Sequence, residues 1–370
     1  MKEKNNALDA AYQFEAEMPL LRAIPLGLQH VLAMFVGNLT PLLIITGACG
    51  IVGGSDLADL QISLLQNAMI IAGIVTLVQL YAIGPCGGKV PIIMGTSSGF
   101  IGVFNGVAAT MGSGVTAYGA MMGASIIGGL FEGVLGFFLK PLRRFFPAVV
   151  TGTVVLSIGL SLIAVGINSF GGGFGAKDFG SMENVLLATF VLAVILFFKH
   201  ATKGFVSYSS ILCGIIAGYV AAFVMGLVLP TTAVDANGVE YTKAWVLNWN
   251  KVAEAGWFAV PELLPVDIVF DMRAILPVAI MFIVTAVETV GDISGVMEGG
   301  MGREATDKEL SGGVICDGLG SSFAALLGVL PNTSFSQNVG LVAMNKVVNR
   351  FSIATGGIFL IACCLFPKLA

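Results

Sequence analysis

Two carboxylates lie within the apolar run IVTAVETVGDISGV. Glu288 and Asp292 are four residues apart, so on a helix both side chains project from one face, about one turn apart. A charged residue inside a membrane costs ~2.5–3.5 kcal/mol on insertion scales, so it usually faces a bundle interior or a water-filled cavity. The pair therefore predicts a site for a ligand or a proton. In the alternative interpretation, Asp292 and Glu298 lie at a frayed cytoplasmic end and Glu288 only bonds a neighbouring helix.

A second polar group lies in PNTSFSQNVGLVAMNK (331–346), close to further apolar runs. Gln337 and Asn338 can each donate and accept hydrogen bonds. A carboxylate opposite a carboxamide offers acceptors and donors in one plane, which suits a planar heterocycle with alternating N–H and C=O groups. These residues predict a small, polar, neutral or weakly charged ligand, with one carboxylate binding it and another free to take a proton.

Three further ionisable residues lie in apolar runs. Asp317 has small neighbours, so we expect it to reach the backbone or polar side chains of a neighbouring helix, in a structural or coupling role. His30 has a side chain that titrates near neutral pH, but a satisfied interior histidine is the simpler interpretation. Glu132, flanked by Gly129 and Gly133, is interpreted as part of a packing face with a snorkelling or bonded carboxyl group.

The composition indicates a membrane protein. Of 370 residues, 56% are hydrophobic and 11% are charged, whereas soluble domains have about 25% charged residues. The net charge of −4 without a basic tract argues against a nucleic-acid partner. No cofactor is expected, because the six cysteines form no CxxC pair and are interpreted as reduced packing residues. The stretch GPCGGKV lacks the spacing and the Ser or Thr of a phosphate-binding loop.

Apolar runs near the ~20 residues that cross a bilayer recur along the chain. Eleven membrane segments are predicted: 24–47, 60–84, 91–106, 114–138, 146–167, 184–198, 205–229, 273–297, 309–329, 333–347 and 352–366. If the N-terminus is cytoplasmic, the clusters of Lys and Arg fall at the cytoplasmic ends of the predicted segments, where such clusters are usually found. The polar connection 230–272, with three Trp residues, is then extracellular. A multi-pass protein of the cell (plasma or inner) membrane is expected, with the lipid bilayer as its partner.

Two of these segments are interrupted. PIIMGTSSGFIGVF (91–104) and PNTSFSQNVGLVAM (331–344) each begin with Pro, pass through a Thr-Ser stretch and only then become apolar. They are seven segments apart and enter the membrane from opposite sides, which indicates an inverted repeat with a binding site where the breaks meet. The residues assigned to this site are Thr96, Ser97, Ser98, Glu288, Phe335, Ser336, Gln337 and Asn338. In the alternative, both breaks are re-entrant loops without a ligand.

Several stretches resemble the nucleobase–ascorbate transporters, also called nucleobase cation symporters. They are QHVLAM, FPAVVTGTVVLSIGLSLIAVGIN, ETVGDISGV, GGVICDGLGSSFAALLGVLPNTSFSQNVGL and GGIFLIACCLFPKLA. The similarity runs from about residue 20 to the last residue. Within this family, SFSQNVG resembles the xanthine and uric acid permeases, because uracil permeases usually have Glu-Asn at the positions of Gln337 and Asn338. One departure is Asn345, where the family usually has Thr.

The resemblance implies an all-α fold of fourteen segments in two inverted repeats of seven, with short extended strands in segments 3 and 10. It implies a core domain (23–140 and 273–370) and a first part of a gate domain (141–230). The charge pattern itself predicts a cytoplasmic arm (1–22) and an extracellular loop (231–272). About eleven of the fourteen segments would then be present, and gate segments 12–14 would be absent. A homodimer is also implied.

The resemblance also implies roles for matched residues. Glu288 would hydrogen-bond the base, and Gln337 would read its other edge. Site geometry, support and coupling would fall to His30, Asp292, Asp317 and Asn338.

The sequence therefore predicts a secondary active symporter, not an enzyme, that imports xanthine or uric acid with protons by alternating access. Sodium is the alternative coupling ion. Three other functions stay open: a uracil or pyrimidine permease of the same fold, an anion transporter or channel of related inverted-repeat architecture, and a membrane remnant that does not transport.

Overall fold

The computed structural model describes residues 10–52, 56–139, 166–173, 176–202, 210–235, 238–247 and 257–366, with isolated positions between 149 and 163. The helices are α2 (Leu20–Ala48), α3 (Ala58–Tyr81), α4 (Ile101–Met111), α5 (Gly114–Phe137), α8 (Met182–Ala201), α10 (Ser210–Val228), α12 (Met272–Met301), α13 (Asp307–Leu326), α14 (Ser336–Asn345) and α15 (Arg350–Leu365). The shorter elements are β1 (Met94–Thr96), η1 (Ser98–Phe100), β2 (Thr232–Val234), β3 (Glu240–Thr242) and β4 (Asn332–Ser334).

The helices follow the predicted segments closely. Segment 3 divides into β1, η1 and α4, and segment 10 into β4 and α14, as their interrupted pattern predicts. Within the described ranges, five helices are long and apolar enough to cross a membrane: α2, α3, α5, α8 and α12. Most of predicted segment 146–167 and the start of 205–229 lie outside the described residues. All six cysteines are free thiols, as predicted.

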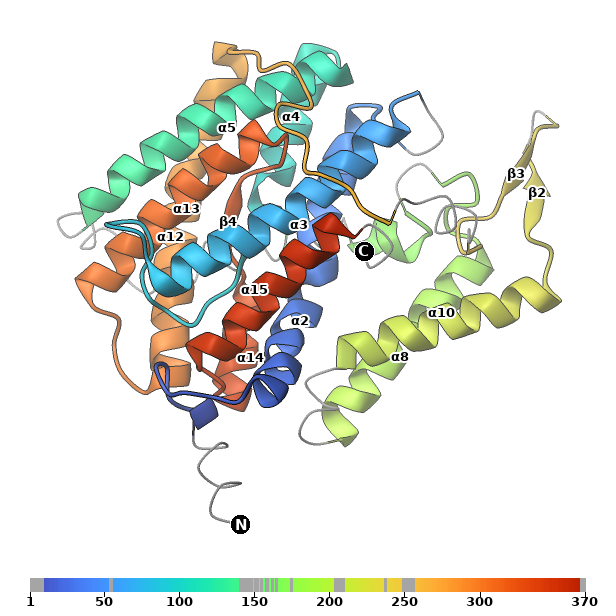
Figure 1. The fold of residues 1–370 in the computed structure, drawn as a ribbon. Helices are drawn as coiled ribbons and strands as arrows, with labels where there is room; N and C mark the ends of the chain where they lie inside the picture. Colours follow the sequence, from blue (N-terminus) through green and yellow to red (C-terminus); the bar gives the residue numbers. More distant parts are fainter. Residues whose placement is uncertain are drawn as a thin grey trace. The chain divides into compact units, whose positions relative to one another are not determined.

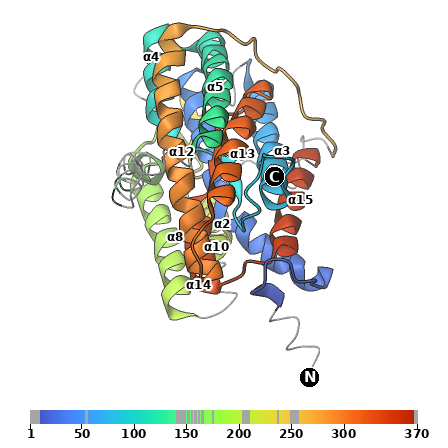
Figure 2. The same ribbon diagram turned by 90° about the vertical axis from the view of Figure 1, so that its left-hand side faces the viewer.

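The chain divides into a larger compact unit, Met1–Ile158 with Gly256–Ala370, and a smaller one, Gly159–Ala255. In the larger unit, α13 packs against α5 and α12, and α15 packs against α2 and α3 (Figure 1, Figure 2). Glycine allows the closest of these contacts, because a Cβ on Gly129 of α5 would lie 2.4 Å from the carbonyl oxygen of Gly318 of α13. Small residues permit such close approach between membrane helices.

Local signals fix the ends of α12 and α13. The Asp271 carboxylate accepts a hydrogen bond from the Arg273 amide at 2.8 Å and caps the start of α12. Gly302 ends this helix at φ +68°, in the left-handed region that glycine adopts freely. A capping box of Thr306 and Glu309 starts α13. Both helices that carry the predicted carboxylates therefore begin at well-defined caps.

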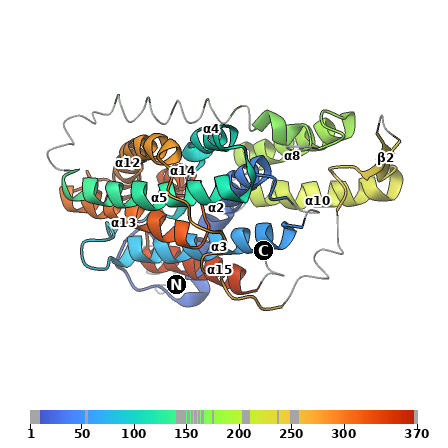
Figure 3. The same ribbon diagram turned by 90° about the horizontal axis from the view of Figure 1, so that it is seen from above.

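The two broken segments pair with each other through β1 and β4. Strand β4 lies among the helices of the larger unit (Figure 1), and Figure 3 shows several of these helices, among them α3, α5 and α13, from above. The strands are antiparallel, in the register Met94↔Ser334, Gly95↔Thr333 and Thr96↔Asn332. The Ser97 amide also donates to Pro331 at 2.8 Å, and the Phe335 amide to Ile93 at 3.0 Å. Segments that enter the membrane from opposite sides run in opposite directions, so their strands pair antiparallel. The pairing also gives hydrogen-bond partners to backbone N–H and C=O groups, which the bilayer core does not supply.

The smaller unit contains α8, α10 and an antiparallel hairpin, β2–β3, which the sequence analysis did not predict. Lys243, just after β3, forms an ion pair with Glu183 of α8 at 2.7 Å. Trp245 is only 6% exposed and belongs to the interior of this unit, where its ring lies beside Gly226 of α10.

Candidate functional site

One face of α12 gathers polar side chains. Thr285, Glu288, Thr289 and Asp292 follow the spacing i, i+3, i+4, i+7 of a single helix face, and all four are buried. The alternative interpretation of a frayed end at Asp292 is wrong, because α12 continues to Met301. Glu298, two turns further along the chain, is exposed.

Asp292 connects α12 to the break in segment 10. Its carboxylate accepts a hydrogen bond from the Ser334 hydroxyl at 2.7 Å. The Ser336 hydroxyl lies 3.0 Å from each carboxylate oxygen. Since Ser334 ends β4 and Ser336 begins α14, this one carboxylate holds both sides of the break.

Asp317 of α13 makes a similar connection. Its Oδ2 accepts hydrogen bonds from Thr289 of α12 and, at 3.1 Å, from Thr333 of β4. The prediction that Asp317 reaches polar side chains of its neighbours is confirmed. Its Oδ1 is buried and has no partner among the described residues.

Glu288 differs from both aspartates. Its side chain lies on the same face of α12 and is 7% exposed, but its Oε2 has no hydrogen-bond partner within the described ranges. A buried acceptor without a donor costs about 1–3 kcal/mol, and more for a charged group. Glu288 therefore offers an unfilled acceptor next to the residues that hold the break.

Segment 3 contributes Thr96, Ser97 and Ser98. The Thr96 amide donates to Asn38 of α2 at 2.8 Å, and the buried Thr96 hydroxyl has no partner among the described residues. Ser97 Oγ accepts from the Gly99 amide at 3.2 Å and so caps η1, and Ser98 is half-buried. Asn38 was not among the predicted site residues, although an Asn in an apolar run was a signal for it.

The start of α14 carries the remaining predicted residues. Phe335 is buried, with its ring against Gly37 and Gly95, where a Cβ would lie 2.9 and 2.7 Å from ring atoms. Gln337 is exposed. Asn338 is fully buried, and its Nδ2 lies 3.0 Å from the carbonyl oxygen and 3.1 Å from the ring Nδ1 of His30.

His30 is buried but only half satisfied. Its Nε2 has no partner among the described residues, so the interpretation as a satisfied histidine is wrong for this nitrogen. The structure thus brings predicted residues into two groups: Glu288, Asp292, Asp317 and Ser336 around the break, and Asn338 with His30. The sequence analysis did not assign the hydroxyl donors Thr289, Thr333 and Ser334, although Thr289 shares the polar face of α12.

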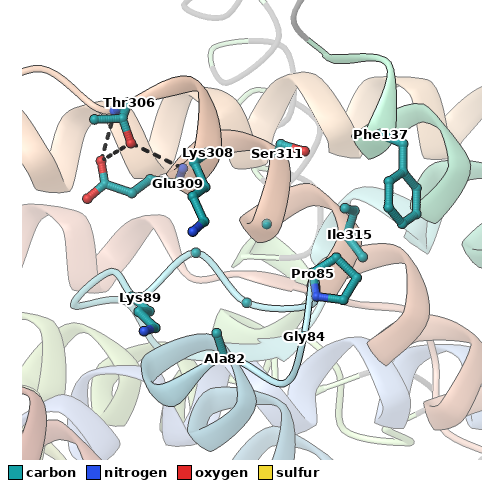
Figure 4. A pocket seen from close by; sticks show the side chains of 13 residues that line it. Ala82, Gly84, Pro85, Lys89, Phe137, Thr306, Lys308, Glu309, Ser311 and Ile315 are labelled. Carbon is teal, nitrogen blue, oxygen red and sulfur yellow. Dashed lines mark hydrogen bonds between the residues drawn. The ribbon is translucent and has the colours of Figure 1, made fainter.

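A cavity of about 580 Å³ lies elsewhere, at the ends of α3, α5 and α13 (Figure 4). Its wall includes part of the GPCGGKV loop, Lys308 and Phe137, and none of the predicted site residues. The Gly87 amide donates to Gly312, and the Gly88 amide donates to Gln79. These amides are already used by the protein, which agrees with the rejection of this loop as a phosphate-binding loop.

The fold is that of a membrane transporter built from inverted repeats. It is similar to the transmembrane domain of the cyanobacterium bicarbonate transporter BicA, with a TM-score of 0.62 over 96% of this chain and 85% of that one. The sequence identity is 16%, so this likeness shows the fold alone.

The chain belongs to the Permease family, whose model matches residues 21–370. The uric acid permease PucK of Bacillus subtilis (strain 168) is 35% identical over 100% of this chain and 76% of its own. The xanthine permease XanP of Escherichia coli (strain K12) is 31% identical over 97% of this chain and 75% of its own. The predicted membership of the nucleobase–ascorbate transporters is confirmed, and the chain is a multi-pass transporter, not an enzyme.

Proposed function

We propose that this chain imports a purine base, xanthine or uric acid, with protons by alternating access. The observation that carries the proposal is Glu288, a buried carboxylate with an unfilled acceptor beside the break in segment 10. The relatives named for uric acid and xanthine support the choice of a purine.

The geometry supports recognition of a planar base by its edge. Glu288 would accept a ring N–H, and Gln337 would bond the opposite edge of the base. The half-helices α4 and α14 begin at the breaks, so their N-terminal amides add partial positive charge there. Thr96 would supply a further hydroxyl, because its Oγ1 has no partner among the described residues.

The coupling proposal rests on the two buried aspartates. Asp292 and Asp317 tie α12 and α13 to β4 through hydroxyl donors. Charge inside a membrane is costly, so a proton taken up with the base would lower the cost of moving the site between the two sides. In this proposal the larger unit contains the moving core, the smaller unit is part of the gate, the N-terminus is cytoplasmic and the protein is a homodimer.

Equilibrium binding tests the substrate. We expect labelled xanthine to bind the purified 370-residue chain in detergent, and uric acid to displace it while uracil does not. Displacement by uracil but not by uric acid would favour the pyrimidine permease. Absence of xanthine binding by a folded chain would contradict an assembled purine site.

Uptake into proteoliposomes tests the coupling ion. We expect xanthine uptake to be several-fold faster at about pH 6 outside than at about pH 8, because external protons then drive uptake together with the base. Replacing sodium with potassium should leave the rate unchanged. A strict sodium requirement would overturn the proton proposal and leave the substrate proposal standing.

A further inference from the structure

We propose that Glu132 of α5 and Asp317 of α13 form a buried acid pair that holds one proton, and that this proton takes part in coupling. The inference rests on the proposed proton symport and extends it to a helix outside the substrate site. It concerns a carboxylate that the binding mechanism does not use.

Glu132 is fully buried, so its carboxyl group does not snorkel to the membrane surface. Its Oε1 accepts a hydrogen bond from the Thr285 hydroxyl of α12 at 3.1 Å. Its Oε2 is buried without a partner among the described residues. A packing role alone would need no carboxylate at this position, and a charged carboxylate there is costly.

Asp317 lies where the backbone of α13 touches that of α5. A Cβ on the next residue, Gly318, would lie 2.9 Å from the backbone carbon of Glu132. The Oδ2 of Asp317 is occupied by two threonine hydroxyls, whereas its Oδ1 has no partner within the described ranges. Each acid therefore has one satisfied oxygen and one unsatisfied oxygen.

One proton lowers the cost of burying the two acids. Two neighbouring carboxylates in a water-poor interior cannot both be ionised without a large cost, and such pairs share a proton. A protonated carboxyl gains a donor that can serve a neighbouring acceptor, and it no longer repels the charge of the other acid. With one proton bound, the pair carries one negative charge instead of two.

The groups facing Glu132 add only negative charge. Asp317 belongs to α13 and Glu288 to α12, two helices that pack against α5, and Asp292 of α12 is a further acid near Asp317. The helix α4, which also packs against α5, contains no titratable side chain in its sequence, IGVFNGVAATM. No cation of the described residues is among the electrostatic partners of Glu132, so a proton is the simplest way to balance the pair.

The hydrogen bonds of the pair reach the substrate face of α12. Glu132 is bonded to Thr285 and Asp317 to Thr289, and Glu288 lies between these two threonines on the same face. A change of charge on the pair therefore changes the electrostatic potential at the Glu288 carboxylate. This gives a physical route by which proton uptake alters binding of the base.

Calorimetry of xanthine binding tests the inference. Titrations of the purified chain in two buffers of different ionisation enthalpy give the number of protons taken up with each base. The wild-type chain is expected to take up protons, and Glu132→Gln to take up half as many or fewer and to show a flatter dependence of affinity on pH. Glu298→Gln, which removes a charge from an exposed position of α12, is the matched control and should behave as wild type.

The outcomes separate this inference from the proposed function. If the wild-type chain takes up no protons, the proton symport itself is wrong, and the acid pair with it. If wild type takes up protons and Glu132→Gln takes up as many, only the acid pair is wrong. Should Glu132→Gln fail to fold, Thr285→Val replaces it, because loss of the hydrogen bond to Glu132 should shift the pH midpoint of binding. An unchanged midpoint would overturn the inference.

Discussion

Replacing Glu288 with Gln is expected to abolish high-affinity xanthine binding. Glu288 is 7% exposed and its Oε2 has no partner among the described residues, so its carboxylate is available to a ring N–H of the base. A hydrogen bond to a charged group contributes about 1.5–3 kcal/mol, and the new amide NH₂ would also face a donor. We expect the dissociation constant to rise roughly 10- to 150-fold or more, measured by equilibrium binding.

The control for this prediction is again Glu298→Gln. Both substitutions remove one negative charge from α12, but Glu298 is exposed and lies beyond the polar face that carries the site. We expect wild-type affinity for Glu298→Gln and similar melting temperatures for both variants. Wild-type affinity in Glu288→Gln would show that the base is bound by other groups, and the site assignment would be wrong.

The three carboxylates of the site have different surroundings, which is why Glu288 has the largest expected effect. Asp292 accepts hydrogen bonds from Ser334 and Ser336, so its role is to hold the break. Asp317 is held on one side by threonine hydroxyls. Glu288 lies on the same polar face of α12 as Asp292, but its Oε2 has no hydrogen-bond partner among the described residues.

Membrane segments were the most predictable part of the fold. The run 114–138 becomes α5 (Gly114–Phe137), and the run 184–198 becomes α8 (Met182–Ala201). A bilayer requires long apolar helices, so a simple count of apolar residues identifies them. The hairpin β2–β3 was not predicted, because its strands are too short to resemble membrane spans. Its signal is the Asn-Gly pair at 237–238 between the stretches TTAV and VEYT, which is typical of a hairpin.

The two breaks were predictable, but their register was not. Pro followed by a Thr-Ser stretch marked both breaks, and their opposite directions predicted that they meet. The register depends on distant side chains: a Cβ on Gly95 would lie 2.5 Å from Met34 and 2.7 Å from Phe335. No local pattern contains this information.

The hydroxyl partners of the aspartates could not be assigned for a similar reason. Segments 8 to 10 contain many Ser and Thr residues, and hydrogen bonding is short-ranged, so the choice among them depends on the packing of α12, α13 and β4. The sequence alone predicts only that Thr285 and Thr289 lie on one face of the helix. That face follows from the spacing of these residues around Glu288.

Replacing Gln337 with Ala is expected to give the second largest loss of binding. Gln337 lies in the first turn of α14 and is exposed, and its Nε2 points toward α2, 3.8 Å from where a Cβ on Gly37 would lie. Its carboxamide offers a donor and an acceptor together, so Ala removes both contacts to the edge of the base. We expect xanthine affinity to fall roughly 10-fold or more, measured by equilibrium binding.

Gln337→Glu tests whether the hydrogen-bonding groups of this side chain determine which base is bound, because the variant keeps the length of the side chain. Glu keeps the length of the side chain but replaces the amide donor with a second acceptor, so a base edge that presents an acceptor is no longer matched. Xanthine and uric acid should therefore compete less well than in the wild-type chain, and uracil should lose least, because uracil permeases usually have Glu at this position. Gln66→Ala, a half-buried Gln of α3, is the control and should leave all three affinities unchanged. If Gln337→Ala and Gln337→Glu both keep the wild-type order and strength of competition, the base must be read by groups other than α14.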